Sequence, residues 1–332
     1  MSTHDPDTLL AETREFNAEL ERQLATIPPV NTVPPEESRR ARREGRGIFP
    51  APVFLPEART VWIEGPGGPV SLRVIEPEEE PAGVFLHIHG GGWTLGENDM
   101  QDLRLKRLAH EAGLTVMSVG YRLAPENPYP AAPDDCETAA LWLLARRDEL
   151  ARSGPLAIGG DSAGGHLTAV TLLRLRDRHG ITGAFAAAVF QYGCFDLSMT
   201  PSQRHWGERN LVLSESIMIW YADQFLPGRD REQRRDPDIS PLFADLSGMP
   251  PAVFTVGTQD PLLDDTLFME ARWRAAGHPT ELHVWPEAPH GFLSLPMTVA
   301  DPALSTEHDF LRRTLRLDLS TPTLTHPQEV PG

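Results

Sequence analysis

Gly160-Asp161-Ser162-Ala163-Gly164 is the most diagnostic segment of this sequence for its fold. It matches the pattern Gly-x-Ser-x-Gly, in which a serine sits on a sharp turn between a strand and a helix. The flanks fit that context, because the apolar run 155–158 precedes the motif and the helical pattern 166–175 follows it. Glycines let the chain turn tightly, and the N-terminus of the following helix offers N–H groups and positive potential to an oxyanion. The motif therefore predicts Ser162 as a nucleophile, against the alternative of a merely structural turn.

A second glycine-rich motif, His89-Gly90-Gly91-Gly92-Trp93, follows an apolar strand pattern. Three consecutive glycines allow backbone conformations that aim N–H groups inward, as in the oxyanion-hole loop of lipases and esterases. A phosphate-binding loop is the alternative, but no Gly-Lys-Ser/Thr follows and Lys106 is the only lysine of the chain. A single lysine also argues against Schiff-base and pyridoxal-phosphate chemistry. The two motifs together are far more specific than either alone.

The partners of the serine are expected near the C-terminus, in the chain order Ser, Asp, His. A strand pattern runs directly toward Asp260, and an acid just beyond a strand fits the third member of a triad. Asp264 and Asp265 are its rivals, although their positions fall on the start of a helix. His290 follows the last strand pattern in a loop, from which its side chain can reach the serine.

The remaining histidines are weaker candidates for the base. His87 and His283 lie within strand patterns and are interpreted as packing residues. His166 is one helical turn past the serine and is expected to line the pocket. His205 lies in a long insertion, where a substrate contact and a surface position are both open. We expect His166, His205 and Trp93 to contact the substrate.

Strand and helix patterns alternate along most of the chain. Such alternation predicts an α/β fold with a mostly parallel sheet and helices on both faces. The first two strands are separated by Gly65-Pro66-Gly67-Gly68, which predicts a hairpin. The expected strands are 60–63, 70–76, 83–88, 114–120, 156–159, 185–191, 252–256 and 281–285, and the clearest helices between them are 100–111 and 134–147.

Three stretches stand outside this alternation. The N-terminal arm shows one apolar stripe at helical spacing, through Ile27, after which the pairs Pro28-Pro29 and Pro34-Pro35 stop any helix. A long insertion has no strand pattern but a helical one at 214–225, so we expect it to cap the site. The C-terminal stretch has the composition of a disordered tail. The expected organisation is a cap arm at 1–50, a catalytic domain at 51–319 with a cap insertion at about 196–245, and a tail at 320–332.

Composition excludes several classes of partner. The formal net charge of −17 repels phosphates, which argues against nucleic acid and anionic membranes. Cys136 and Cys194 lack metal-binding spacing, and two free thiols are favoured over a disulfide. No membrane-spanning run and no secretory signal are visible, so a cytoplasmic location is expected. The expected partner is a small molecule, and both a monomer and a homo-oligomer are open.

With these residues in hand, the sequence resembles the bacterial hormone-sensitive-lipase-like esterases (family IV lipolytic enzymes, the α/β hydrolase fold-3 group). The resemblance runs from about residue 61 to residue 313 and rests on seven blocks in family order: His89-Gly-Gly-Gly-Trp93, Tyr121-Arg-Leu-Ala-Pro-Glu126, Tyr129-Pro-Ala-Ala132, Gly160-Asp-Ser-Ala-Gly-Gly165, Ile239-Ser-Pro-Leu242, Asp260-Pro-Leu262 and His290-Gly-Phe292.

This resemblance implies an α/β-hydrolase fold, with an eight-stranded, mostly parallel sheet and a helical cap built partly from the N-terminal arm. It implies that Ser162, Asp260 and His290 form a catalytic triad. In the family, the residue at the position of His89 shapes the glycine loop, and the position of His166 is often Asn. The implied oxyanion hole consists of the backbone N–H groups of Gly91, Gly92 and Ala163.

The sequence therefore predicts a serine carboxylesterase that hydrolyses short-chain acyl esters through an acyl-enzyme, with no metal and no cofactor. The resemblance implies the preference for short chains, and the highly charged insertion, which has few contiguous apolar residues, adds modest support to it. An arylformamidase or other amidase would use the same machinery and stays open. A non-catalytic small-molecule binder of the same fold also stays open, although such proteins tend to lose the triad histidine, and His290 is present.

Overall fold

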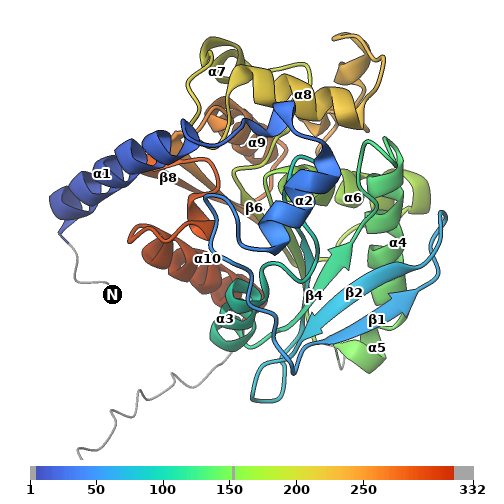
Figure 1. The fold of residues 1–332 in the computed structure, drawn as a ribbon. Coiled ribbons are helices and arrows are strands. Elements are labelled where there is room, and N and C mark those ends of the chain that lie inside the picture. Colours follow the sequence, from blue (N-terminus) through green and yellow to red (C-terminus); the bar gives the residue numbers. More distant parts are fainter. Residues whose placement is uncertain (1–4, 152–153, 318–332) are drawn as a thin grey trace, which may run out of the picture.

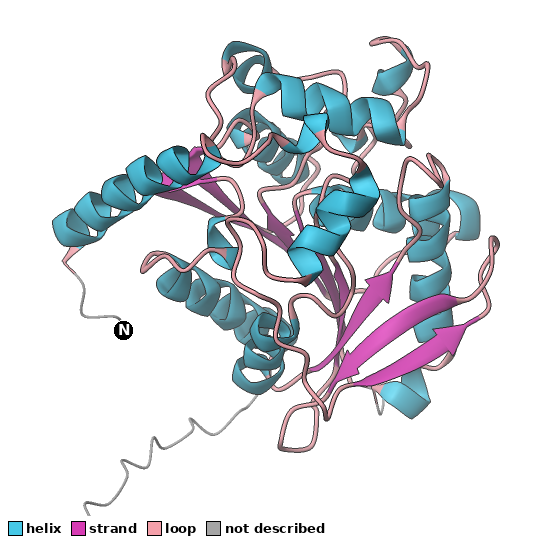
Figure 2. Ribbon diagram, in the orientation of Figure 1, coloured by secondary structure: helices cyan, strands magenta, loops and turns pink. Residues whose placement is uncertain are grey.

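A computed structural model describes residues 5–151 and 154–317 of the chain, and the tail expected at 320–332 lies outside them. Its centre is one sheet with the strand order β1-β2-β4-β3-β5-β6-β7-β8 (Figures 1 and 2). β1 and β2 pair antiparallel, as do β2 and β4, and all other neighbours pair parallel. All eight expected strands are present: β1 Arg59–Ile63, β2 Val70–Ile75, β3 Val84–Ile88, β4 Thr115–Gly120, β5 Leu156–Asp161, β6 Ala187–Gln191, β7 Ala252–Gln259 and β8 Thr280–Pro289.

Helices cover both faces of this sheet, as a parallel sheet requires. α3 and α10 pack on one face, and α4, α6 and α9 pack on the other (Figure 1). Along β5, Leu156 and Ile158 join the core beneath α4 and α6, whereas Ala157 faces α3 and α10. The helices are α1 Pro6–Leu24, α2 Pro35–Arg43, α3 Asp102–Ala112, α4 Ala131–Ala145, α5 Arg147–Leu150, α6 Ala163–His179, α7 Pro201–His205, α8 Glu215–Phe225, α9 Leu263–Ala275 and α10 Ala300–Leu315, with short 3-10 turns η1 Val30–Thr32, η2 Gln233–Arg235, η3 Pro241–Phe243 and η4 Phe292–Ser294.

The N-terminal arm holds two helices rather than the one expected. α1 ends at Leu24, and Ile27 lies beyond it with 39% of its surface exposed. α2 begins at Pro35, where the sequence interpretation placed a helix stop. That interpretation was wrong because a proline at the first helical position lacks only an N–H that has no partner there. Proline breaks a helix only when it lies in the interior.

The first turn of α9 ties the insertion between β6 and β7 to the body of the protein. One carboxylate oxygen of Asp265 accepts hydrogen bonds from the backbone N–H groups of Phe195 (2.7 Å) and Asp196 (2.9 Å). Asp264 accepts a bond of 2.8 Å from the N–H of Ser202. The two rivals of Asp260 therefore hold the insertion in place.

No helix in the described parts of the chain is both long and apolar enough to cross a bilayer.

Candidate active site

Ser162 lies at the tip of the sharp turn between β5 and α6. Its backbone has φ 54° and ψ −118°, a region that few non-glycine residues adopt. A Cβ atom on Gly160 would lie 2.3 Å from the carbonyl oxygen of Ile88, and one on Gly164 would lie 1.9 Å from the same atom. The glycines of the motif are therefore required because α6 begins directly against the end of β3. Such local strain is a common property of functional sites.

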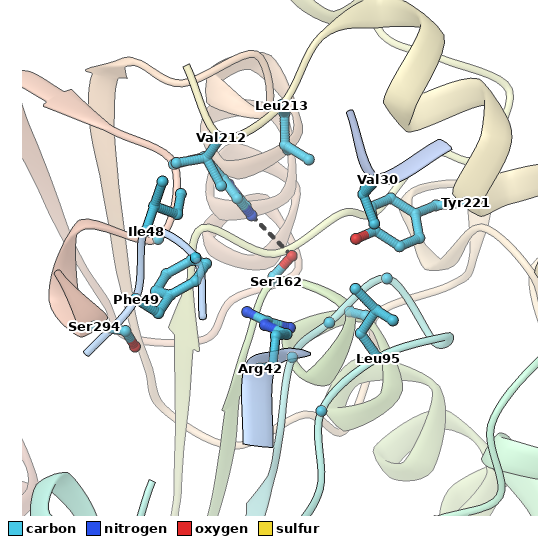
Figure 3. A pocket seen from close by; sticks show the side chains of 18 of the residues that line it. Val30, Arg42, Ile48, Phe49, Leu95, Ser162, Val212, Leu213, Tyr221 and Ser294 are labelled. Carbon is cyan, nitrogen blue, oxygen red and sulfur yellow. Dashed lines mark hydrogen bonds between the residues drawn. The ribbon is translucent and has the colours of Figure 1, made fainter. Parts of the chain in front are cut away.

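A line of hydrogen bonds connects Ser162, His290 and Asp260. Nε2 of His290 lies 2.9 Å from Oγ of Ser162, the bond that is dashed in Figure 3. Nδ1 of His290 lies 2.8 Å from Oδ2 of Asp260, whose other carboxylate oxygen accepts the N–H of Leu262. Both Asp260 and His290 are buried. Because a carboxylate only accepts, Nδ1 carries the imidazole proton and Nε2 is left to accept the serine proton.

The three-glycine loop follows β3 and faces the same turn. Gly91 and Gly92 have φ values of 118° and 60°, so neither position suits a side chain. A Cβ on Gly91 would lie 2.2 Å from the carbonyl oxygen of Leu95. The N–H groups of Gly91, Gly92 and Ala163 donate to no backbone carbonyl of the described residues. They are therefore available to an atom bound beside Ser162.

A buried polar network supports the turn from below. The guanidinium of Arg104 lies 3.0 Å from the carboxylate of Asp161, the residue before the serine. Burial opposes the charge of Asp161, but Arg104 holds its pKa below the ordinary value. Nδ1 of His87 forms a hydrogen bond of 2.8 Å with the hydroxyl of Ser118, as expected for a packing residue. Nδ1 of His89 lies 2.8 Å from the carbonyl oxygen of Gly90, and burial lowers the pKa of His89 to about 4, so its ring is neutral and braces the loop.

A cavity of about 670 Å³ opens above Ser162. Its walls come from the glycine loop, from the N-terminal arm and from the insertion between β6 and β7, with mostly apolar side chains (Figure 3). Val30, Ile48 and Phe49 represent the arm, and Val212 and Leu213 represent the insertion. These apolar residues are scattered in the sequence, so no apolar run in the sequence indicated the apolar wall of the cavity.

The three expected substrate contacts differ in where they lie. Trp93 lines the cavity, and its contact with a substrate stays a prediction. His166 does not: it is fully buried behind Trp93, with Nδ1 accepting the indole N–H at 3.0 Å. His205 does not line the cavity either, because it ends α7 on the exposed side while Gln203 of the same helix turns inward. The predictions for His166 and His205 are therefore corrected.

Two features of the site were missed by sequence reasoning. Tyr192 follows β6, and its ring packs edge-on against His290 at a centroid distance of 5.0 Å. Its position at the carboxyl end of a parallel strand is a signal that could have identified it. The entry of α2 into the cavity wall had no comparable signal.

Cys136 and Cys194 are both free, as favoured, and Cys194 lines the cavity.

Comparison with known proteins gives a consistent assignment. A family model described as an α/β hydrolase fold matches residues 85–294, which include Ser162, Asp260 and His290. The carboxylic ester hydrolase LipN of Mycobacterium tuberculosis is 36% identical over 254 residues, covering 74% of this chain and 67% of that protein.

Two solved structures share the architecture at similar levels. A hyperthermophilic esterase from the archaeon Pyrobaculum calidifontis has a TM-score of 0.80 at 28% identity, covering 90% of this chain and 97% of that one. A hormone-sensitive lipase from a metagenome library has a TM-score of 0.79 at 27% identity, covering 95% and 100%. The predicted fold and the predicted family resemblance are confirmed. This chain belongs to the α/β hydrolase fold family, in the group of the hormone-sensitive-lipase-like esterases.

Proposed function

We propose that this protein is a serine carboxylesterase that hydrolyses short-chain acyl esters through an acyl-enzyme formed on Ser162. The observation that carries the proposal is the hydrogen-bonded line from Ser162 to His290 (2.9 Å) and on to Asp260 (2.8 Å) at the floor of a cavity. The relatives named as carboxylic ester hydrolases and esterases support the choice of ester bonds. Because these hydrogen bonds join all three residues of the triad, they argue against a non-catalytic binder.

The chemistry proceeds in two similar steps. Nε2 of His290 takes the proton of Ser162 as the serine oxygen attacks the ester carbonyl, and it then delivers this proton to the departing alcohol. Water repeats the attack on the acyl-enzyme with His290 again as the base, which releases the acid. Asp260 keeps the proton of the neutral imidazole on Nδ1 and stabilises the charge that forms on the ring.

The negative charge that develops on the carbonyl oxygen needs donors close to the serine. We assign this role to the N–H groups of Gly91, Gly92 and Ala163, which have no backbone acceptor of their own within the described residues. Donors of this kind contribute roughly 2.7–4 kcal/mol each to the transition state in comparable enzymes. The start of α6 adds positive potential at the same point.

We also propose that the arm at 1–50 and the insertion at about 196–245 act together as a cap that sets substrate choice. Both segments contribute cavity-lining residues, such as Val30 from the arm and Leu213 from the insertion. The cytoplasmic location expected from the sequence stays a prediction, and a monomer and a homo-oligomer both stay open.

Replacing the nucleophile tests the proposed function. Purified Ser162→Ala should lose several orders of magnitude in the hydrolysis of nitrophenyl acetate and butyrate while its circular dichroism spectrum is unchanged. Matched nitroanilides, measured with the unmodified protein, separate an esterase from an amidase. Near wild-type hydrolysis by Ser162→Ala would refute the assignment. A fluorophosphonate adduct located on Ser162 by mass spectrometry is the positive counterpart.

A further inference from the structure

Arg42 is a charged side chain that lines the cavity and has no charged partner among the described residues. It projects from α2 into the space that Ser162 faces (Figure 3). Its guanidinium stacks over the ring of Phe49, 4.7 Å from the ring centroid. In the described parts of the chain it forms neither a salt bridge nor a side-chain hydrogen bond, and Glu37, the acid on the same helix that also lines the cavity, is exposed and lies beyond ion-pair distance.

The other arginines of the cavity wall are all neutralised. Arg104 is bound to Asp161, as described above. Arg46 lies 2.6 Å from the carboxylate of Glu44, and Arg234 lies 2.5 Å from that of Asp223. Arg42 is partly buried, and charged groups that leave water are normally paired, so a guanidinium with no acid partner among the described residues is unusual in a mostly apolar cavity. The charge of Arg42 is therefore available to a ligand.

A second hydrogen-bond donor, the hydroxyl of Tyr221, belongs to the same cavity. The ring of Tyr221 rests on the glycine loop, where a Cβ on Gly92 would lie 2.3 Å from it. Its hydroxyl points into the cavity and has no hydrogen-bond partner in the described residues (Figure 3). Burial raises the pKa of Tyr221 to about 12, and the charge of Arg42 acts in the opposite direction. At neutral pH the hydroxyl keeps its proton and can donate it.

We propose that Arg42 binds a carboxylate of the substrate, so that the preferred esters carry an anionic group, as in the half-esters of short dicarboxylic acids. The planar guanidinium suits a carboxylate because it offers two parallel N–H donors. The hydroxyl of Tyr221 supplies a further donor to the same group. This inference rests on the proposed ester hydrolysis and names the substrate class of the same site.

Two pairs of esters test it, each pair differing only by a carboxylate in place of a methyl group. Methyl hydrogen glutarate and methyl pentanoate place the charge on the acyl side. 4-Acetoxybutanoate and butyl acetate place it on the alcohol side. The readout is the ratio of kcat/KM for the anionic ester to kcat/KM for the neutral one. It is measured for the wild type, Arg42→Met, Arg42→Lys and the control Arg40→Met. Arg40 is exposed on the same helix and does not line the cavity.

In at least one pair, Arg42→Met should lower the ratio roughly 10- to 100-fold, the loss expected for a hydrogen bond to a charged group. Arg42→Lys should retain part of the preference because it keeps the charge, and Arg40→Met should keep the wild-type ratio. Ratios that are unchanged in Arg42→Met for both pairs would overturn the inference, and Phe49 stacking would then be the only role of Arg42.

Failure of the proposed function would look different. In that case the wild type would hydrolyse none of the four esters, and calorimetric binding of methyl hydrogen glutarate and methyl pentanoate to the same variants would decide the inference without turnover. Binding of the glutarate ester that is weakened in Arg42→Met and intact in Arg40→Met supports it, and equal binding by both contradicts it. Equal melting temperatures of the two variants exclude a folding defect as the cause.

Discussion

The indole N–H of Trp93 donates a hydrogen bond of 3.0 Å to Nδ1 of His166. Because Nδ1 accepts this bond, the ring proton lies on Nε2, which is 2.7 Å from the carbonyl oxygen of Ile239. Burial lowers the pKa of His166 to about 4, so the ring stays neutral and can make both bonds. Trp93 is also stacked on Phe225, with ring centroids 4.8 Å apart. His166 therefore positions a wall of the cavity from behind rather than forming that wall itself.

Removing the ring of His166 should loosen this wall. His166→Leu leaves the N–H of Trp93 buried without an acceptor, which should reduce the free energy of unfolding by about 1–3 kcal/mol and lower kcat/KM. His166→Asn supplies an acceptor and should recover part of both. The control His205→Asn changes an exposed residue and should match the wild type. Urea denaturation and ester kinetics give the two readouts, and a His166→Leu variant as stable and active as the wild type would contradict the assigned role.

Asp260 and Asp264 should differ in a mutational comparison. Asp260→Asn places an amide donor against Nδ1 of His290, which favours the wrong tautomer, so kcat should fall by about 10⁴-fold, as in serine protease triads. Asp264→Asn keeps an oxygen that can accept the N–H of Ser202, and its kcat should stay close to the wild-type value. Comparable losses in both variants would remove Asp260 from the triad.

Glu307 should make stability depend on pH. It lies buried on α10, its carboxylate bonded to the amide of Gln191, and faces Arg104, Asp161 and Tyr192. Burial raises the pKa of Glu307 from 4.5 to about 7. The folded state holds this proton more tightly than the unfolded state does. The contribution of this proton to the free energy of unfolding is therefore fully present below pH 4.5 and is lost as the pH rises toward about 7.

The variant Glu307→Gln carries no titratable group at that position. Between pH 5 and pH 8, the free energy of unfolding of the wild type should therefore fall by about 1–3 kcal/mol relative to that of Glu307→Gln. Urea denaturation at several pH values measures the difference. Glu232→Gln, at a carboxylate whose side chain is 86% exposed, is the matched control and should follow the wild-type curve. Parallel curves for Glu307→Gln and the wild type would show that this proton does not contribute.

Chain-length preference should follow from the size of the cavity. Each buried methylene adds about 0.8 kcal/mol to binding only while apolar wall remains available. A cavity of about 670 Å³ must hold the acyl and the alcohol parts together, so the gain should end among the short and medium chains. The test is kcat/KM for esters from acetate to palmitate. A steady increase up to palmitate would contradict the predicted preference.

Features that depend on local backbone geometry could be predicted from the residues alone. A glycine is needed at Gly160 because a Cβ there would collide with β3, and such a requirement appears in the sequence as an invariant part of a motif pattern. The alternation of strand and helix patterns likewise predicted the eight strands of the sheet. Ser162, Asp260 and His290 each follow a predicted strand. They were expected to meet because residues just beyond parallel strands lie at one edge of the sheet.

The directions in which individual side chains point could not be predicted in the same way, because they depend on packing between distant segments. Whether Pro35 ends or begins a helix depends on how the arm packs against the body, and α2 brings Arg42 over Ser162 from far away in the sequence. His166 turns away from the cavity because Ile239, in another segment, offers its carbonyl oxygen. Local propensity is set by neighbours along the chain, whereas these directions are set by contacts between distant segments, and a single sequence does not encode them in a readable pattern.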